Sequence, residues 1–329
     1  MRATISAIAH YVPDDVFDNH WFEQRIETSD EWIRTRTGIV ERRFLKEGGV
    51  SDMLAPAAQK CLQRRGLTAA DVDCIIVASV TPDRIFPSTA AIVQRKIGAA
   101  NAWGFDLAAA CSGFLNALVT ASKLVESGAV KNVLLCSGDK MSAILDFDDR
   151  ATSVLFGDGA GAVFIEQSDD DSVGLMDFIL RMDGNGEPHL HQKAGGSLRP
   201  PTAETVANRE HFVYQEGQTV FKSAVVGMAD VSYEILERNG LTGNDVAWLV
   251  PHQANLRIID ATAKRMGLPS EKVMVNIDRY GNTTAGTIPI CLSELYEQGK
   301  VHRGDYLVLS SFGAGYTWGA ILLKWSIKD

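Results

Sequence analysis

The sequence predicts an α/β fold made of two related halves. Apolar strand-like runs alternate with helical segments along the chain, and short motifs of the first half recur in the second. Residues 74–80 (CIIVASV) and 132–138 (NVLLCSG) are apolar almost throughout, as in parallel strands buried on both faces. We therefore expect mainly parallel sheets covered by helices.

The repeat is clearest at 66–72 (GLTAADV) and 240–246 (GLTGNDV), each of which leads into an apolar strand. Three looser matches follow in the same order: 90–98 with 260–267, 128–138 with 299–311, and 161–165 with 319–323. Because four ordered matches indicate a duplication, each half should fold as the same unit.

The two halves are expected at 1–170 and 206–329. Residues 168–205 have no recognisable counterpart in the first half. We therefore assign 171–205 to an inserted segment of strands and loops that acts as a lid.

Helix ends carry recognisable signals. The helical segments 51–66 and 112–128 each close on a glycine, Gly66 and Gly128, as expected for a left-handed C-terminal cap. Residues 28–31 (TSDE) have the pattern of a capping box and predict a helix through Trp32 and Arg36.

Composition excludes several classes of protein. The formal net charge of −9 argues against nucleic-acid binding, and the N-terminal residues contain no apolar run that could start a signal peptide or a membrane span. The five cysteines are odd in number and contain no CxxC pair. This usage fits neither a disulfide framework nor a zinc site and favours the reducing cytoplasm.

Cys111 lies where a strand-like run (GFDL) passes into the helical segment 112–128. The N-terminal end of a helix favours a thiolate, and the small residues around this cysteine leave room for a substrate. A buried structural cysteine is the alternative that this segment alone leaves open. The other cysteines (Cys61, Cys74, Cys136 and Cys291) fall within apolar helix or strand patterns and are expected in the core.

Two polar residues of the second half occupy comparable positions. His252 follows the apolar run 246–250, at the kind of strand end where ligands bind in parallel sheets. Asn282 lies in a turn-rich stretch just before the helical segment 287–299. For each, a structural turn is an open alternative.

Two glycine-rich turns and a pair of histidines are further candidate sites. Residues 157–162 (GDGAGA) match a dinucleotide-binding fingerprint, but a strand follows, so the required strand–turn–helix context fails. The turn 313–315 (GAG) lies between two strand patterns and could direct backbone N–H groups at an oxyanion. His189 and His191 have no third ligand in view, so we predict no metal site.

Six segments together resemble β-ketoacyl-acyl carrier protein synthase III, a family of thiolase-fold condensing enzymes. They run along nearly the whole chain: TSDEWIRTRTGI, AAACSGF, FGDGAGAVF, PHQANLR, RYGNTTAG and SSFGAGYTWGA. The resemblance implies a thiolase-like fold with duplicated βαβαβαββ halves in a five-layer α-β-α-β-α arrangement, and a homodimer. It also implies condensation of acetyl-CoA with malonyl-acyl carrier protein, without a metal or bound cofactor.

The resemblance assigns the catalytic roles residue by residue. Cys111 would carry the acyl group, while the backbone N–H groups of Cys111 and Ala314 hold the thioester oxyanion. The family often has Gly where this chain has Ala314, but the N–H remains. His252 and Asn282 would donate hydrogen bonds to the malonyl thioester as carbon dioxide leaves, which suits a neutral His and an amide.

Binding residues follow from the same resemblance. Trp32 and Arg150 would hold the adenine of CoA, helped by Thr28 and Arg36. Phe221 and Asn255 would line the pantetheine tunnel. Acyl carrier protein would contact a second set: Lys222, Gln253, Arg257, Lys264 and Arg265. Independently of the resemblance, Arg257, Lys264 and Arg265 share one helical face, and a basic stripe on an acidic chain suits an acidic partner. Phe86 would close the end of the acyl pocket across the dimer interface and Phe156 would form another wall, so that the pocket accepts only short starters.

The same residues bear on several alternative activities. Cys, His and Asn also occur in this order in papain-like proteases, but the flanking C-G-[SA]-C-[WY] signature is missing. A non-catalytic binding subunit would be expected to have lost one of the three residues. A thiolase would need a second catalytic cysteine, and only Cys291 is available in the second half. A chalcone-type or hydroxymethylglutaryl-CoA-type synthase, using CoA substrates only, stays open; the basic stripe favours a carrier-protein substrate.

Overall fold

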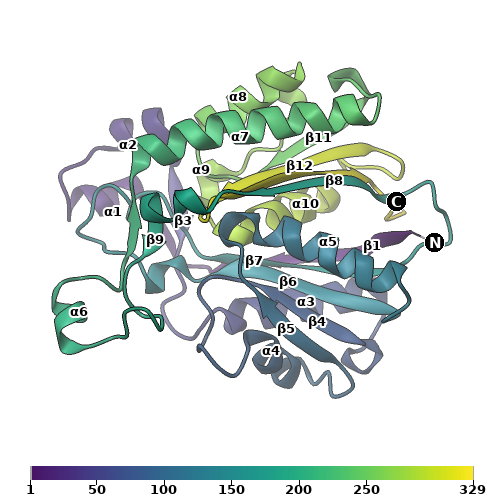
Figure 1. The fold of residues 1–329 in the computed structure, drawn as a ribbon, viewed down its shortest axis with the longest axis horizontal. Coiled ribbons are helices and arrows are strands. Elements are labelled where there is room, and N and C mark those ends of the chain that lie inside the picture. Colours follow the sequence, from purple (N-terminus) through teal and green to yellow (C-terminus); the bar gives the residue numbers. More distant parts are fainter. Residues whose placement is uncertain (1, 329) are drawn as a thin grey trace.

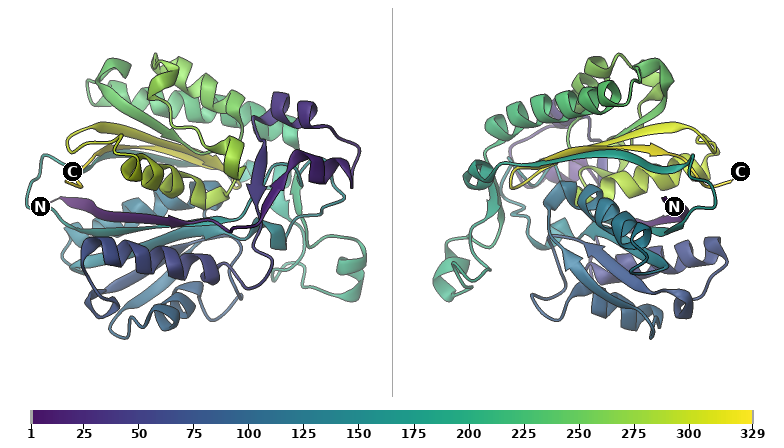
Figure 2. Two further views of the ribbon diagram at one scale, coloured as in Figure 1. Left: turned by 180° about the vertical axis from the view of Figure 1, so that it is seen from behind. Right: turned by 45° about the vertical axis from the view of Figure 1, so that its right-hand side comes forward.

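Two β-sheets and the helices around them form five layers in the computed structural model, which describes residues 2–328 (Figures 1 and 2). Two helices cover the outer face of the first sheet, α3 (Ser51–Arg65) and α4 (Thr89–Ile97). Between the sheets lie α5 (Gly113–Glu126) and α10 (Thr287–Glu297), and the second sheet is covered by α7 (Gly217–Arg238) and α8 (Leu256–Met266). The predicted α-β-α-β-α arrangement is confirmed.

The first sheet has the strand order β1-β7-β6-β4-β5. β4 runs parallel to β5 and β6, whereas β7 runs antiparallel to β6 and β1. With the helices in sequence order, the first half reads β1-α3-β4-α4-β5-α5-β6-β7, which is the predicted βαβαβαββ unit. Its strands are β1 (Ala3–Tyr11), β4 (Cys74–Ala78), β5 (Trp103–Leu107), β6 (Asn132–Asp139) and β7 (Gly159–Gln167).

The second sheet repeats this plan with the order β11-β12-β13-β8. β8 pairs antiparallel with β13 as β1 does with β7, and β11 pairs parallel with β12. The strand equivalent to β5 is reduced to an isolated bridge between Val273 and Leu249. The strands are β8 (Gly174–Met182), β11 (Val246–Pro251), β12 (Tyr306–Gly313) and β13 (Thr317–Lys324).

The segment expected to be an insertion, 171–205, divides into two parts. The expectation is wrong for β8, because this strand completes the second sheet as the counterpart of β1. The residues between β8 and α7 lie outside the five layers, and α6 (Ala203–Ala207) projects from the body of the molecule (Figures 1 and 2). Within them, β9 (Leu190–Gln192) pairs with β10 (Val213–Gln215) in a two-stranded ribbon. We propose that the second half begins at β8.

A second segment outside the two main sheets follows β1 and contains β2 (Val16–Asp18), α1 (Asn19–Glu23), α2 (Asp30–Thr37) and β3 (Glu41–Arg43). The capping box predicted at 28–31 does not form: the N-cap of α2 is Ser29, whose hydroxyl accepts the Trp32 N–H at 3.1 Å. Because the N-cap is Ser29 and not Thr28, the helix begins one residue later than expected. The Asp30 N–H is bound by the carboxylate of Glu23 at 2.6 Å.

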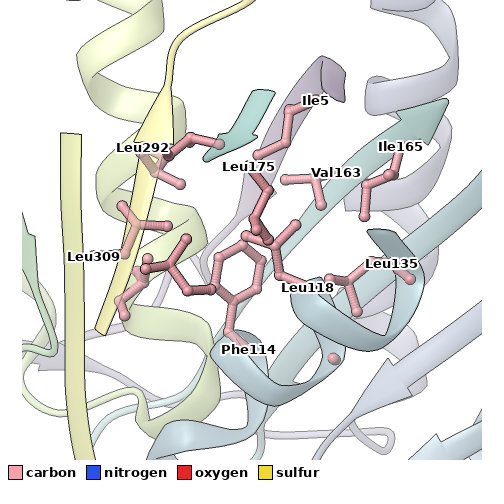
Figure 3. Packing of buried hydrophobic residues seen from close by; sticks show 14 of the residues in the cluster. Ile5, Phe114, Leu118, Leu135, Val163, Ile165, Leu175, Leu292 and Leu309 are labelled. Atoms are coloured by element: carbon pink, nitrogen blue, oxygen red, sulfur yellow. The ribbon is translucent and has the colours of Figure 1, made fainter. Parts of the chain in front are cut away.

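The largest apolar cluster lies between the two sheets and joins the halves (Figure 3). Phe114 and Leu118 of α5 pack among residues of both sheets, including Val163 of β7 and Leu309 of β12. Burying a side chain of this size stabilises the fold by roughly 1.5–3 kcal/mol. This packing holds the start of α5 against the end of β12, where the candidate site lies.

Two further expectations concern the core and membranes. Cys61, Cys74, Cys136 and Cys291 are all fully buried in apolar clusters, as predicted, and all five cysteines are free thiols. No helix within residues 2–328 combines the length and apolar character needed to cross a membrane.

Candidate active site

One pocket of about 830 Å³ collects residues from both halves of the chain. Cys111, His252 and Asn282 all line it, although they come from the start of α5, the end of β11 and the turn before α10. Several of the other predicted residues also line this pocket: Trp32, Arg36, Phe156, Phe221, Lys222, Asn255, Arg257 and Ala314.

Cys111 lies in a 3-10 turn (Ala110–Ser112) that leads directly into α5. The residue before it, Ala110, has a positive φ of 46°, which is uncommon for a non-glycine residue. The Ser311 hydroxyl donates to the Cys111 carbonyl at 2.8 Å and ties the turn to β12. This backbone geometry presents the cysteine, only 8% exposed, at the base of the pocket.

The end of β12 passes very close to Cys111. A Cβ atom on Gly313 would lie 2.8 Å from the Cys111 nitrogen, so only glycine fits there. The next residue, Ala314, also lines the pocket. This approach brings the backbone of residues 313–314 beside that of Cys111, as an oxyanion site shared between the two segments would require.

The resting state of the thiol differs from the expected thiolate. Burial raises the pKa of Cys111 to about 12, and the negative charge of Asp139 acts in the same direction. Its own backbone N–H and the Asn282 side chain lower this pKa, but by less. Desolvation therefore outweighs the helix N-terminus, and the unliganded protein holds a protonated thiol at neutral pH.

His252 lies directly after β11 and is 1% exposed. Its Nδ1 lies 2.7 Å from the Thr287 hydroxyl oxygen, while its Nε2 is buried and has no hydrogen-bond partner among residues 2–328. Burial lowers the pKa of His252 to about 3, so the imidazole is neutral. A neutral ring with one unpartnered nitrogen at the pocket is suited to binding a substrate atom.

Asn282 is held by its own backbone, which pairs with residues on both sides of Phe156. Its N–H donates to the Leu155 carbonyl at 2.9 Å, and its carbonyl accepts the Gly157 N–H at 3.0 Å. The side-chain oxygen accepts the Thr284 N–H at 2.8 Å. Because that bond occupies the oxygen, the amide NH₂ group is left to face the Cys111 thiol and the pocket.

Asp139, at the end of β6, is a site residue that the sequence analysis missed. It is fully buried, and its Oδ1 accepts bonds from the Ser79 hydroxyl at 2.8 Å and the Val80 N–H at 2.7 Å. Its Oδ2 accepts from the Thr284 hydroxyl and from the Ala285 N–H at 3.2 Å. In the sequence, the charged residue Asp139 at the end of the otherwise uncharged run NVLLCSGD could have indicated its role at the site.

The pocket entrance is built on Trp32. The Arg150 guanidinium carbon lies 4.0 Å from the centroid of its ring, and that of Arg36 lies 5.5 Å away. Asn255 caps α8 through its side-chain oxygen, and its amide donates to the Arg36 carbonyl at 2.9 Å. A half-buried indole with two cations beside it suits a planar, negatively charged ligand such as a nucleotide.

The pocket also has a wall that the sequence analysis did not assign. It is formed by the β9–β10 ribbon and the first turn of α7, through Leu190, His191, Gln192, Val213, Gln215 and Gln218. Part of the predicted lid segment thus lines the site.

His189 forms a contact with Glu216, at 2.5 Å between Nδ1 and a carboxylate oxygen. Within residues 2–328 no group of His, Cys, Asp or Glu side chains is arranged to hold a metal ion.

Some predicted residues lie away from the pocket wall. The assignment of Gln253 to a carrier-protein surface is wrong, because this side chain is fully buried. Its amide donates to the carbonyls of Pro251 and Met274, and its oxygen accepts the Asn276 N–H at 3.0 Å. It therefore braces the loop that carries His252 and cannot reach a partner.

The remaining predicted residues are also outside the lining. Thr28 is half-buried, and Phe86 is 83% exposed on this chain. Lys264 and Arg265 are exposed on α8, and the guanidinium carbon of Arg265 lies 4.3 Å from the centroid of the Tyr233 ring. Phe86 therefore does not contact the acyl pocket within a single chain.

Comparison with known proteins agrees with this geometry. The family model described as 3-Oxoacyl-[acyl-carrier-protein (ACP)] synthase III matches residues 105–184, and the model of its C-terminal part matches residues 236–325. Beta-ketoacyl-[acyl-carrier-protein] synthase III of Chlorobium luteolum is 56% identical over 99% of this chain and all of its own length. The protein of the same name from Porphyromonas gingivalis W83 is 51% identical over 99% of this chain and 97% of its own length.

Solved structures give the same result. The 3-oxoacyl-[acyl-carrier-protein] synthase III of Aquifex aeolicus superposes with a TM-score of 0.91 at 41% identity, covering 98% of this chain and all of the other. The Thermus thermophilus synthase III gives 0.90 at 43% identity, covering 98% and 99%. The chain therefore belongs to the β-ketoacyl-[acyl-carrier-protein] synthase III family, the thiolase-fold acyltransferases that catalyse condensation in fatty-acid synthesis.

Proposed function

We propose that this enzyme condenses acetyl-CoA with malonyl-acyl carrier protein, with Cys111 as the acyl carrier and His252 and Asn282 as hydrogen-bond donors. The convergence of these three side chains on one pocket, with the imidazole held neutral, is the observation that carries the proposal. The resulting product is acetoacetyl-acyl carrier protein.

In the first half-reaction, the Cys111 sulfur attacks the thioester carbon of acetyl-CoA. The carbon–sulfur bond to CoA breaks, and the proton of the Cys111 thiol ends on the departing CoA sulfur. The backbone N–H groups of Cys111 and Ala314 stabilise the tetrahedral oxyanion. The close approach of Gly313 to the Cys111 nitrogen supports this pairing.

In the second half-reaction, the malonyl thioester loses carbon dioxide and becomes an enolate. Its carbon attacks the acetyl group on Cys111, the bond to sulfur breaks, and the cysteine sulfur takes up a proton. The enolate oxygen needs donors and no general base, which suits the neutral His252 and the Asn282 amide. The thioesters and the release of carbon dioxide supply the driving force, so the reaction requires neither a metal nor a bound cofactor.

Substrate binding follows from the pocket entrance. We assign the adenine of CoA to Trp32 between Arg36 and Arg150, with Thr28 close by, and the pantetheine arm to the wall formed by Phe221 and Asn255. The carrier protein would contact the exposed cations beside this entrance, which are Lys222, Arg257, Lys264 and Arg265. These cations stand out on a chain of net charge −9 and suit an acidic partner.

A homodimer in the cytoplasm is the expected working form. β5 is an edge strand of the first sheet, and its Trp103 is 51% exposed. Ile85 and Phe86 are 80% and 83% exposed. Large apolar side chains beside an open sheet edge favour pairing with a second copy, and five free thiols suit a reducing compartment.

The starter is proposed to be short. Phe156 is buried and lines the pocket beside Cys111 and Asn282. Phe86 could contribute to the acyl pocket only of a partner subunit, because it is exposed on its own chain. We expect acetyl-CoA or propionyl-CoA to prime the enzyme better than chains of eight or more carbons, since overpacking a buried pocket typically costs about 1–3 kcal/mol.

The proposed reaction is tested by stoichiometry. Purified enzyme with acetyl-CoA and malonyl-acyl carrier protein should release one CoA and one carbon dioxide for each acetoacetyl-acyl carrier protein formed. Malonyl-CoA in place of the carrier-protein substrate serves as the comparison. Turnover with malonyl-CoA and none with malonyl-acyl carrier protein would favour an enzyme that uses CoA substrates only, and efficient priming by octanoyl-CoA would contradict the short acyl pocket.

A further inference from the structure

Thr287, the first residue of α10, lies directly behind the imidazole of His252. Its hydroxyl oxygen is 2.7 Å from Nδ1, and both residues are buried, at 2% and 1% exposure. The two residues come from segments 35 positions apart in the sequence. Thr287 is not on the pocket wall, so any effect on the substrate must pass through the histidine.

The proton on this hydrogen bond determines what His252 can offer the substrate. A neutral imidazole carries one N–H, on either Nδ1 or Nε2. If Thr287 donates to Nδ1, the ring proton must be on Nε2, which then faces the pocket as a donor. If Nδ1 donates to Thr287, Nε2 presents a lone pair instead and can only accept.

Two geometric facts favour donation by Thr287. The separation of 2.7 Å is typical of an O–H donor, whereas N–H donors usually lie about 2.9–3.0 Å from their acceptors. The competing acceptor for the hydroxyl is the Thr284 carbonyl at 3.1 Å. That carbonyl already accepts the Thr287 backbone N–H, so it does not need the hydroxyl proton.

The other ring nitrogen of His252, Nε2, supports the same assignment of the proton. Nε2 is buried and has no hydrogen-bond partner in the described chain, which is energetically costly unless a ligand atom forms a hydrogen bond with it. The atom that the proposed reaction places there is a thioester or enolate oxygen, which accepts hydrogen bonds. Only the Nε2–H form of the ring can satisfy it.

We propose that Thr287 is a positioning residue that donates its hydroxyl proton to Nδ1 of His252 and thereby keeps the other ring nitrogen protonated toward the substrate. The inference rests on the proposed role of His252 as a donor to the enolate. The short segment 282–287 then controls both donors: it contains Asn282, and through Thr287 it keeps His252 in the donor form.

The kinetic test replaces the hydroxyl without changing the volume of the side chain. Thr287→Val should reduce decarboxylation of malonyl-acyl carrier protein about 10-fold to 100-fold, mainly in kcat, as when a partner that orients a histidine ring is lost. Acetylation of the cysteine should change less than about 3-fold, because it needs no donor from His252. Thr287→Ser should recover most of the lost activity.

A matched control is Thr262→Val. Thr262 is fully buried in α8, and its hydroxyl donates to the Ile258 carbonyl at 2.9 Å, away from the pocket. This variant should leave the ratio of decarboxylation to acetylation unchanged. The proposal is overturned if Thr287→Val retains full decarboxylation, or if Thr262→Val alters the ratio equally.

Nitrogen-15 NMR of the unmutated enzyme provides a test that does not depend on how a variant folds. The His252 signals are assigned by their loss in His252→Gln. We expect a protonated, pyrrole-type shift at Nε2 and a pyridine-type shift at Nδ1; the reverse pattern would overturn the inference. If His252→Ala itself decarboxylates normally, the proposed function of His252 fails, whereas failure of Thr287→Val alone leaves that function intact.

Discussion

The Asp139 carboxylate and the Thr284 hydroxyl form a buried hydrogen bond that joins the two halves of the enzyme beside the active site. Thr284 has a positive φ of 49°, a backbone conformation that costs a non-glycine residue about 1–2 kcal/mol. Its N–H holds the side-chain oxygen of Asn282 at 2.8 Å. A residue at the end of β6 thus stabilises the turn that orients the catalytic amide.

The first prediction concerns this contact. Asp139→Asn should lower the free energy of unfolding by about 2–4 kcal/mol, because a carboxylate that accepts several buried bonds is replaced by a group with donors of its own. It should also lower the ratio of decarboxylation to acetylation by displacing Asn282. Urea unfolding and the two half-reaction assays measure these effects.

Asp106→Asn is the control for that variant. Asp106 accepts the N–H groups of Thr89 and Ala90 at the start of α4, away from the pocket. Its loss should reduce stability while leaving the ratio of the half-reactions unchanged. A normal ratio in Asp139→Asn would show that Asn282 does not depend on this carboxylate.

The second prediction concerns pH. The pKa of Cys111 is raised to about 12 by burial, compared with 9.0 for an exposed thiol. Raising the pKa of a thiol favours its protonated form, so the thiolate fraction should increase about tenfold per pH unit across pH 7–9 without levelling off. The rate of iodoacetamide modification of Cys111, followed by peptide mass spectrometry, should show this slope. A plateau below pH 8 would mean that the thiolate is stabilised in the unliganded enzyme.

The third prediction separates the two half-reactions. His252→Ala or Asn282→Ala should decrease decarboxylation at least 100-fold, since loss of one donor to a developing oxyanion costs about 10²–10³ in kcat. Acetylation of Cys111 by labelled acetyl-CoA should remain largely intact. Loss of both half-reactions together would instead identify His252 as the base that activates the cysteine.

The fourth prediction concerns the carrier protein. Arg257→Glu combined with Lys264→Glu should raise the KM for malonyl-acyl carrier protein and weaken its salt dependence, because attraction between exposed charges is screened over about 10 Å at 0.1 M salt. Lys131→Glu, which reverses an exposed charge just before β6, is the matched control. An unchanged KM in the double variant, or an equal change in the control, would contradict the assigned surface.

Local patterns predicted much of the fold and the identity of the central site residues. The duplicated GLT motifs, the apolar strand runs and the position of Cys111 before a helix follow from short stretches of sequence. The place of β8 in the second sheet was missed because its residues (GLMDFILRM) pair with β13 across a long sequence separation, and no repeat motif marks them. Strand pairing at such distance is decided by packing, not by local propensity.

The errors at the site also have physical causes. Gln253 is next to His252 in a polar segment, but its burial depends on loop atoms around Met274 and Asn276 that the sequence does not bring together. The state of the Cys111 thiol was misjudged because the helix N-terminus is visible in sequence, whereas desolvation depends on the completed fold. Thr287 was missed because its contact with His252 exists only in three dimensions.

The central claim, that Cys111 carries the acyl group, is tested most directly by intact-protein mass spectrometry after incubation with acetyl-CoA. The unmutated enzyme should gain one acetyl group, located on the peptide that contains Cys111. Cys111→Ser should gain none, because a hydroxyl is far less ionised and less nucleophilic than a thiol. Stoichiometric acetylation of Cys111→Ser, or an acetyl group located on any other residue of the unmutated enzyme, would contradict the account.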